Sequence, residues 1–132
     1  MLQSVLEGDS MEKVKSINFA SIYVGDYQKA FAFYQKHFGF EVKHPMGENA
    51  SWGKAGDAAI YIEGGNKPSD ITEKTVRASV VFNVESASKF FNQLKADGVL
   101  IVQSEPQNMG ADDYWFQFRD PAGNILEILG GH

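Results

Sequence analysis

The sequence SIYVGDYQKAFAFYQKHFGFEV, residues 21–42, has the pattern of a short strand followed by an amphipathic helix. Alternating apolar residues come first, and Asp26 then supplies a side-chain oxygen suited to a helix N-cap. The helical spacing predicts one buried face, formed by Tyr27, Ala30, Phe31 and Tyr34. We expect Gly39 to end the helix, because glycine readily adopts the left-handed backbone conformation found at helix ends.

The sequence VVFNVESASKFFNQLKADGVLIV, residues 80–102, repeats this pattern about sixty residues later. Ser86 takes the place of the N-cap, and Gly98 takes the place of the glycine that ends the helix. Short apolar segments broken by Gly, Asn and Pro follow both helices, and we predict strands at residues 38–44, 50–55, 58–64, 99–103, 114–120 and 124–129. Each half of the chain therefore reads as strand, helix and three strands.

The duplicated unit predicts an α+β fold with two tandem βαβββ modules in a single domain. We place the first module at residues 14–63, a polar linker at 64–75, and the second module at 76–130, with a flexible extension at 1–13. One module alone would leave a bare apolar sheet face, so the two should form a curved mixed sheet around a cavity. The sequence DPAG, residues 120–123, has turn chemistry and should join the last two strands.

Composition narrows the classes of function. The net charge of −5 argues against nucleic acid as a partner, because phosphate binding needs a basic surface. The chain contains no cysteine, which excludes disulfides and thiolate metal sites and agrees with a cytoplasmic location. No apolar run reaches the roughly 20 residues that a membrane-spanning helix needs. A small cationic or neutral ligand fits these observations better than nucleic acid or a membrane.

The duplicated module, the opening YVGDYQKAFAFYQKHFGFEV and the closing FQFRDPAGNILEI resemble the vicinal oxygen chelate superfamily. This superfamily includes glyoxalase I, extradiol dioxygenases, fosfomycin resistance enzymes and bleomycin resistance proteins, and the resemblance covers residues 14–129. It implies the glyoxalase/bleomycin resistance fold and a homodimer. In the metal-dependent members, His or Glu side chains on the first and last strand of each module hold one divalent metal, which acts as a Lewis acid.

The resemblance can be tested at each position where the family has a metal ligand. The position on the first strand is Phe19, and the position on the fifth strand is Ser79. On the fourth strand the match falls on either Ile60 or Tyr61, and only Glu127 on the last strand keeps the family residue. A single carboxylate does not make a divalent-metal site at ordinary metal concentrations, so we expect no metal and no other cofactor.

The three histidines do not supply the missing ligands in the sequence. His37 lies near the end of the first predicted helix, and a favourable interaction with the helix dipole explains why a histidine occurs there. His44 precedes Pro45 at a strand end, which predicts a position on the rim of the site, and His132 is the terminal residue. None of the three has the strand alternation with Glu127 that a metal site would show.

Glu127 alternates with Ile125 and Leu129, so these residues share one face of the last predicted strand. One interpretation is structural: the carboxylate is satisfied by Ser79, by Ser21 or by a tyrosine. Another is that Glu127 anchors a polar or cationic group of a ligand. A third is that it acts as an acid or base, which makes it the one candidate catalytic residue.

The residues expected to line a ligand site are Glu127, Phe19, Ser79, Tyr61, Trp52 and Trp115. Within residues 114–116, either Tyr114 and Phe116 or Trp115 could stack on a planar ligand. We expect a metal-free binding protein that sequesters a drug or metabolite, as bleomycin resistance proteins do, and not an enzyme. The alternatives are a metal-dependent lyase of the glyoxalase type or a dioxygenase, with Glu127 as one ligand, and a metal-free isomerase with Glu127 as base.

Overall fold

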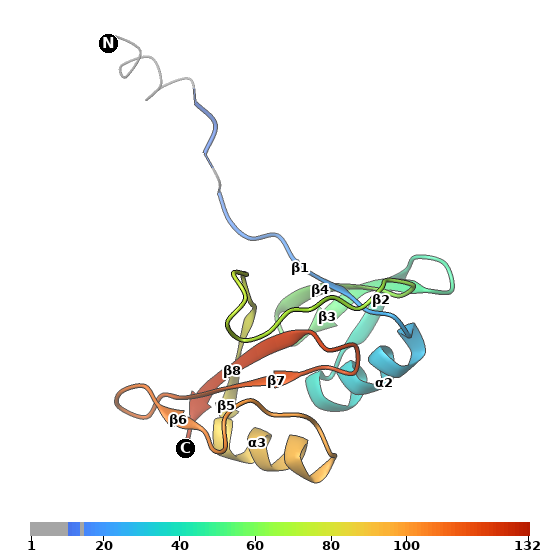
Figure 1. Ribbon diagram of the computed structural model, residues 1–132. Helices are drawn as coiled ribbons and strands as arrows, with labels where there is room; N and C mark the ends of the chain where they lie inside the picture. Colours follow the sequence, from blue (N-terminus) through green and yellow to red (C-terminus); the bar gives the residue numbers. More distant parts are fainter. Residues whose placement is uncertain (1–10, 14) are drawn as a thin grey trace.

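The computed structural model describes residues 11–13 and 15–132 (Figure 1), so most of the predicted N-terminal extension lies outside the described residues. The prediction of two tandem βαβββ modules is confirmed. The first module consists of β1 (Ala20–Tyr23), α2 (Tyr27–Phe38), β2 (Glu41–Pro45), β3 (Ala50–Ala55) and β4 (Ala58–Glu63). The second consists of β5 (Val81–Ser86), α3 (Ala87–Ala96), β6 (Gln107–Asn108), β7 (Tyr114–Arg119) and β8 (Ile125–Gly131).

The strands form two four-stranded mixed sheets, with the orders β1-β4-β3-β2 and β5-β8-β7-β6. In each sheet the first strand of the module pairs in parallel with the last, and the remaining pairs are antiparallel. Figure 1 shows α2 beneath the first sheet and α3 beneath the second. Neither helix in the described part of the chain is long and apolar enough to cross a membrane.

The helix ends follow the caps predicted from the sequence. The Asp26 side chain accepts a hydrogen bond from the amide of Lys29 at 3.1 Å, and Gly39 ends α2 with a φ of 65°. Ser86 makes the same contact with the amide of Lys89 at 3.1 Å and begins α3. Local side-chain chemistry therefore sets where both helices begin.

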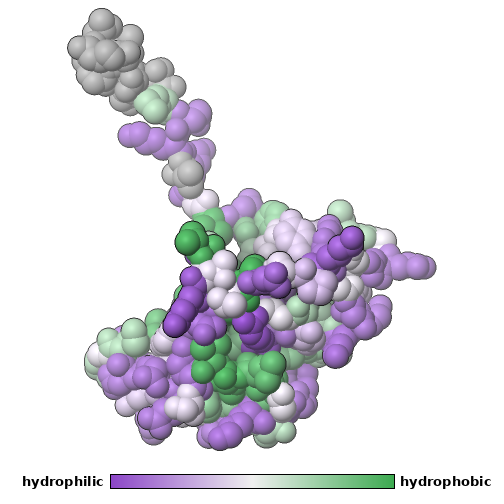
Figure 2. All heavy atoms as spheres, viewed as in Figure 1, coloured by the Kyte–Doolittle hydropathy of each residue, from purple (hydrophilic) through white to green (hydrophobic). Residues whose placement is uncertain are grey.

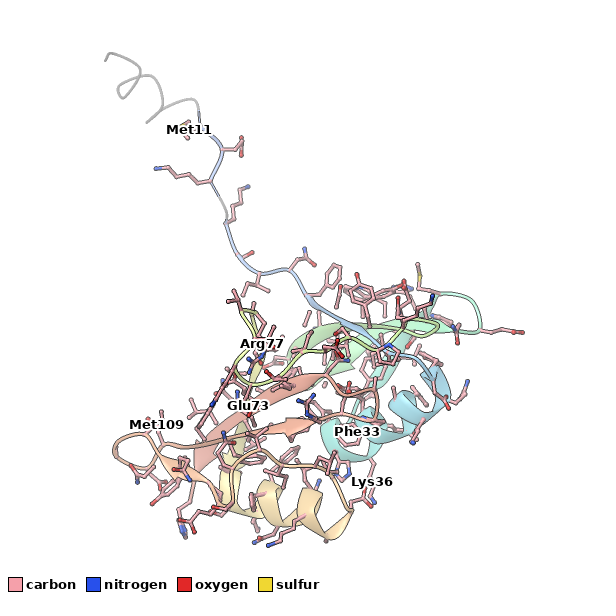
Figure 3. The ribbon with its side chains drawn as sticks, in the orientation of Figure 1. Met11, Phe33, Lys36, Glu73, Arg77 and Met109 are labelled. Atoms are coloured by element: carbon pink, nitrogen blue, oxygen red, sulfur yellow. The ribbon has the colours of Figure 1, made fainter. Side chains whose placement is uncertain are left out.

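The buried face of α2 is wider than the spacing of its apolar residues predicts. Ala30 and Tyr34 are buried as expected, but Phe33 and His37 are buried as well. The Phe33 ring lies 6.0 Å from the ring of Phe118 in β7, which belongs to the other module (Figure 3). Because α2 packs against both modules, it buries more of its surface than one sheet alone would cover.

The strand predicted at residues 99–103 is wrong as a regular element. Ile101 forms only an isolated bridge with Phe118, and the first regular strand after α3 is the two-residue β6. The Gln103 side chain accepts the backbone amide of Gln117 at 2.6 Å and donates to the Gln117 side chain at 3.0 Å. The amide of Gln117 therefore donates to a side chain, whereas in a regular sheet it would donate to a backbone carbonyl of the neighbouring strand.

The two helices meet through a cluster of polar side chains at the end of α2. Lys36 and His37 contact the two carboxylate oxygens of Asp97 at 2.9 and 2.8 Å, and Lys36 lies beside the end of α3 in Figure 3. The amide nitrogen of Gln93 donates to Nδ1 of His37 at 2.9 Å, so Nε2 carries the proton that Asp97 accepts. These hydrogen bonds, that of Lys36 first, lower the pKa of Asp97. Our explanation of His37 by the helix dipole alone is wrong, because the residue is buried between the helices.

The buried carboxylate of Asp120 ties α2 to the turn between β7 and β8. It accepts the hydroxyl of Tyr34 at 2.7 Å, the side-chain amide of Asn124 at 3.0 Å, and the backbone amides of Ala122 and Asn124 at 2.9 Å. Burial raises the pKa of Tyr34, and Asp120 raises it further, so the phenol stays protonated. The predicted DPAG turn is present, since the Gly123 amide donates to the Asp120 carbonyl at 2.9 Å.

The substitution Tyr34→Phe removes the hydroxyl that donates to Asp120 and leaves the ring in the core. We expect the free energy of unfolding to fall by about 1–3 kcal/mol, because a buried carboxylate loses one donor. Urea unfolding followed by circular dichroism measures the change. Tyr114→Phe is the control, since the described residues give the hydroxyl of this half-buried tyrosine no partner, and a change below about 0.5 kcal/mol is expected. Equal losses in both variants would contradict the assigned contact.

Candidate functional site

Each sheet has one face covered by its helix and one face that no element of the described chain covers completely, which we call its open face. Side chains alternate along a strand, so the buried Ile22, Ile60 and Ile62 identify the covered face of the first sheet. Its open face carries Phe19, Ser21, Tyr23, Trp52, Tyr61 and Glu63. The open face of the second sheet carries Val81, Asn83, Trp115, Gln117, Glu127 and Leu129.

Aromatic side chains dominate the open face of the first sheet. The rings of Phe19 and Trp52 meet edge to face, with centroids 5.6 Å apart, and His44 on β2 lies 6.4 Å from Trp52. The rings of Tyr23 and Tyr61 meet in the same way at 6.5 Å. Phe19 is 41% exposed and Tyr23 is 53% exposed, so these rings are available to a ligand.

On the fourth strand, the family position for a metal ligand matched either Ile60 or Tyr61. The structure places Tyr61, and not Ile60, on the open face. Ile60 is fully buried in the core, whereas Tyr61 lies opposite Ser21 of β1 on the open face. The Tyr61 hydroxyl donates to the carboxylate of Glu63 at 2.7 Å. This hydrogen bond is the main reason why the pKa of Tyr61 is raised, with partial burial second. The phenol is therefore protonated at neutral pH and donates to the carboxylate.

Glu127 lies on the open face of the second sheet, where the indole Nε1 of Trp115 donates to its carboxylate at 2.6 Å. The structural interpretation of Glu127 considered Ser79, Ser21 or a tyrosine as its partner, and the partner in the structure is Trp115 instead. Ser79 instead donates its hydroxyl to the backbone carbonyl of Ile125 at 3.2 Å. The pairing of β7 with β8 brings the indole to Glu127, because Gln117 lies directly opposite Glu127 and Trp115 is its diagonal neighbour.

The family positions for a metal can now be tested against the geometry. Phe19 offers no donor atom, Ser79 is engaged with a carbonyl, and Glu127 already accepts a hydrogen bond from an indole. Nowhere in residues 11–13 and 15–132 do three His, Cys, Asp or Glu side chains lie close enough to hold one ion. These residues do not fit a divalent-metal centre, which needs three or four converging nitrogen or oxygen ligands.

Several residues of the open faces were not identified from the sequence, among them Tyr23, Glu63 and Gln117. Glu63 is spaced two residues from Tyr61, and such alternation could have placed it on the same face. Gln117 forms a pair with Gln103 that depends on an irregular loop, so no local pattern indicated it. Of residues 114–116, Phe116 is buried on the covered face, and Trp115 is the ring on the open face.

One cavity in the described part of the chain lies away from Glu127. It has a volume of about 480 Å³ and lies where the end of β1 and the start of α2 meet the linker and the turn at residues 121–124. Its lining includes Tyr23 and Asn66 but neither Glu127 nor Trp115. Figure 2 shows, in addition, an apolar patch between the linker and α3. The side chains that could contact a ligand lie on the open faces. Tyr23 lies on the open face of the first sheet and also lines the cavity.

Two tandem βαβββ modules, each with a four-stranded mixed sheet and one helix, define the fold class of this protein. Residues 16–128 match the family model described as Glyoxalase/Bleomycin resistance protein/Dioxygenase superfamily, and the chain belongs to this family. It is 32% identical over 121 residues to the uncharacterized protein YetH from Bacillus subtilis, a match covering 86% of this chain and 96% of YetH.

Two further comparisons involve a metallothiol transferase and a fosfomycin resistance protein. The chain is 28% identical over 123 residues to the metallothiol transferase FosB from Shouchella clausii, covering 89% of this chain and 82% of FosB. A FosX variant from Listeria monocytogenes, solved with Mn(II) and 1S,2S-dihydroxypropylphosphonic acid, superposes with a TM-score of 0.73. That match is 19% identical and covers 91% of this chain and 95% of FosX, so it shows the shared fold alone.

The metal content of the purified protein tests the conclusion that these residues do not form a divalent-metal site. Purified, untagged protein is offered Mn²⁺, Ni²⁺ or Zn²⁺, dialysed, and measured by elemental mass spectrometry. We expect less than about one tenth of an equivalent to remain, because one carboxylate binds a divalent ion weakly. The variant Glu127→Ala sets the background and should retain as little. Near-stoichiometric metal in the wild type that Glu127→Ala loses would contradict this reading of the site.

Proposed function

We propose that this protein binds a small planar or cationic molecule on its open faces, without a metal or other cofactor, and does not transform it. One observation carries the proposal: the family position for a metal ligand on the first strand holds Phe19, which packs edge to face on Trp52 at 5.6 Å. Such a pair offers ring surface to a ligand and no electron pair to an ion.

The charge and hydrogen bonding of the open faces support a cationic or polar ligand. Glu127 is held in place by Trp115 and keeps acceptor capacity on its carboxylate, so it can anchor a polar group. The net charge of −5 favours the approach of cations. Exposed rings on the first sheet supply stacking area, which binds planar ligands with little side-chain ordering. Sequestration of a drug or metabolite in the cytoplasm is the role that these properties suit.

The proposed binding protein acts as a homodimer. Large apolar side chains remain exposed at both sheets and in the segment that leads into β1: Ile17 is 90% exposed, Phe19 41% and Val81 47%. Figure 1 shows the described part of that segment running away from the two modules. A second copy that covers these surfaces would remove apolar area from water, which is the usual driving force for association.

A metal-dependent lyase or dioxygenase is the second candidate. Its metal dependence is supported by the 28% identical relative FosB, which is named a metallothiol transferase. In such an enzyme Glu127 would be one ligand, and the others would have to come from a partner subunit or from rearranged side chains. The two candidates differ in their response to a chelator, which removes activity from the enzyme and leaves the binding protein unchanged.

Binding of the planar cation proflavine, measured by isothermal titration calorimetry with EDTA present, tests the proposed function. We expect saturable binding that EDTA does not change, and a loss of about five- to thirtyfold in Trp52→Ala, because a ring that supports stacking is removed. Proflavine should be recovered unchanged by chromatography.

Met109→Ala is the matched control for this titration. Met109 is 62% exposed in the loop between β6 and β7, away from the first sheet (Figure 3), so its loss removes apolar surface elsewhere. Affinity in this variant should equal that of the wild type. Absence of binding to wild type, or binding that appears only after a divalent metal is added, would overturn the metal-free proposal.

A further inference from the structure

Glu63 is a second carboxylate beside aromatic rings, on a different sheet from Glu127. It is the last residue of β4, and its two oxygens accept the hydroxyl of Tyr61 at 2.7 Å and the side-chain amide of Asn66 at 3.3 Å. Both donors are neutral groups. A carboxylate has about four acceptor positions, so these two contacts leave acceptor capacity for another donor.

The negative charge of Glu63 has no cationic partner among the residues that the structure describes. The ion pairs there join Lys36 and His37 to Asp97, and Lys43 to Glu41. Glu63 is half-buried, so its charge is screened less than that of a fully exposed carboxylate. A ligand cation placed beside it would gain more from the charge than it would at an open surface.

Two tyrosine rings border the carboxylate. Tyr23 is the register partner of Glu63 in the parallel pair of β1 with β4, and its ring meets that of Tyr61 edge to face at 6.5 Å. Ring faces attract cations because of their negative quadrupole, and the attraction grows as water is excluded. Tyr23 also lines the 480 Å³ cavity, as does Asn66, so the cluster adjoins a space that can hold the rest of a ligand.

We propose that Tyr23, Tyr61 and Glu63 form a subsite for an organic cation, specifically a substituted or quaternary ammonium group of the bound molecule. This inference rests on the proposed function, because it assigns the chemical class of the ligand that the open face of the first sheet takes. The rings receive the alkyl groups on nitrogen, and Glu63 balances the charge. Glu127 on the second sheet is left to hold a different, polar part of the ligand.

Choline and its neutral isostere 3,3-dimethylbutan-1-ol test the subsite, because they share a shape and differ in charge. Binding is measured at low ionic strength by NMR chemical-shift titration of the full-length protein. We expect wild type to bind choline about tenfold or more tightly than the alcohol, and Glu63→Gln to reduce choline affinity by about tenfold. Affinity for the alcohol should change little in this variant.

Glu41→Gln is the matched control for charge. Its side chain is 74% exposed on β2 of the same sheet, so the substitution removes one negative charge without touching the cluster. Choline affinity in this variant should equal that of wild type. If Glu63→Gln fails to fold by circular dichroism, Tyr23→Leu takes its place, since it removes a ring from an exposed position and should also weaken choline binding.

The subsite is overturned if choline and the alcohol bind equally, if choline does not bind, or if Glu41→Gln loses as much affinity as Glu63→Gln. The proflavine titration separates this failure from failure of the proposed function. Proflavine binding that depends on Trp52, with no preference for choline, removes the cation subsite alone. Absence of both kinds of binding removes the proposed function with it.

Discussion

The fold depends on one buried carboxylate. Asp120 has its oxygens filled by the Tyr34 hydroxyl, the side chain of Asn124 and two backbone amides of its own turn, so its charge costs little to bury. The same contacts fix the turn between β7 and β8 and dock it on α2. The position of β8, and so of Glu127, relative to the first module follows from this contact together with the contact between the tilted rings of Phe33 and Phe118.

Features set by neighbouring residues could be predicted from the sequence, and features set by contacts between modules could not. The caps at Asp26 and Ser86 and the glycine at residue 39 act within one helical turn, and all three were identified. Burial of His37 and Phe33 depends on the second module, which no periodicity in α2 reveals. The partner of Glu127 was missed because a diagonal contact across β7 and β8 requires the register of the pair and the rotamer of Trp115.

The open faces of the two sheets carry two different kinds of surface. On the first sheet, Phe19 extends a group of rings beside Glu63, and on the second, Glu127 and Trp115 form a polar pair. A metal centre would force these positions to change together, because each ligand is useful only with the others. If the protein binds no metal, as we propose, each surface can change its chemistry by single substitutions while the core and the caps stay as they are.

The division into two four-stranded sheets also has a mechanical consequence. No strand pairing joins the sheets in the described part of the chain, and side chains such as Tyr34, Asp120, Lys36 and Asp97 make the link between modules. A small rotation of one module against the other would strain these contacts but break no ladder of backbone hydrogen bonds. Side-chain packing in the shared core, and not backbone pairing, therefore resists motion of one module against the other.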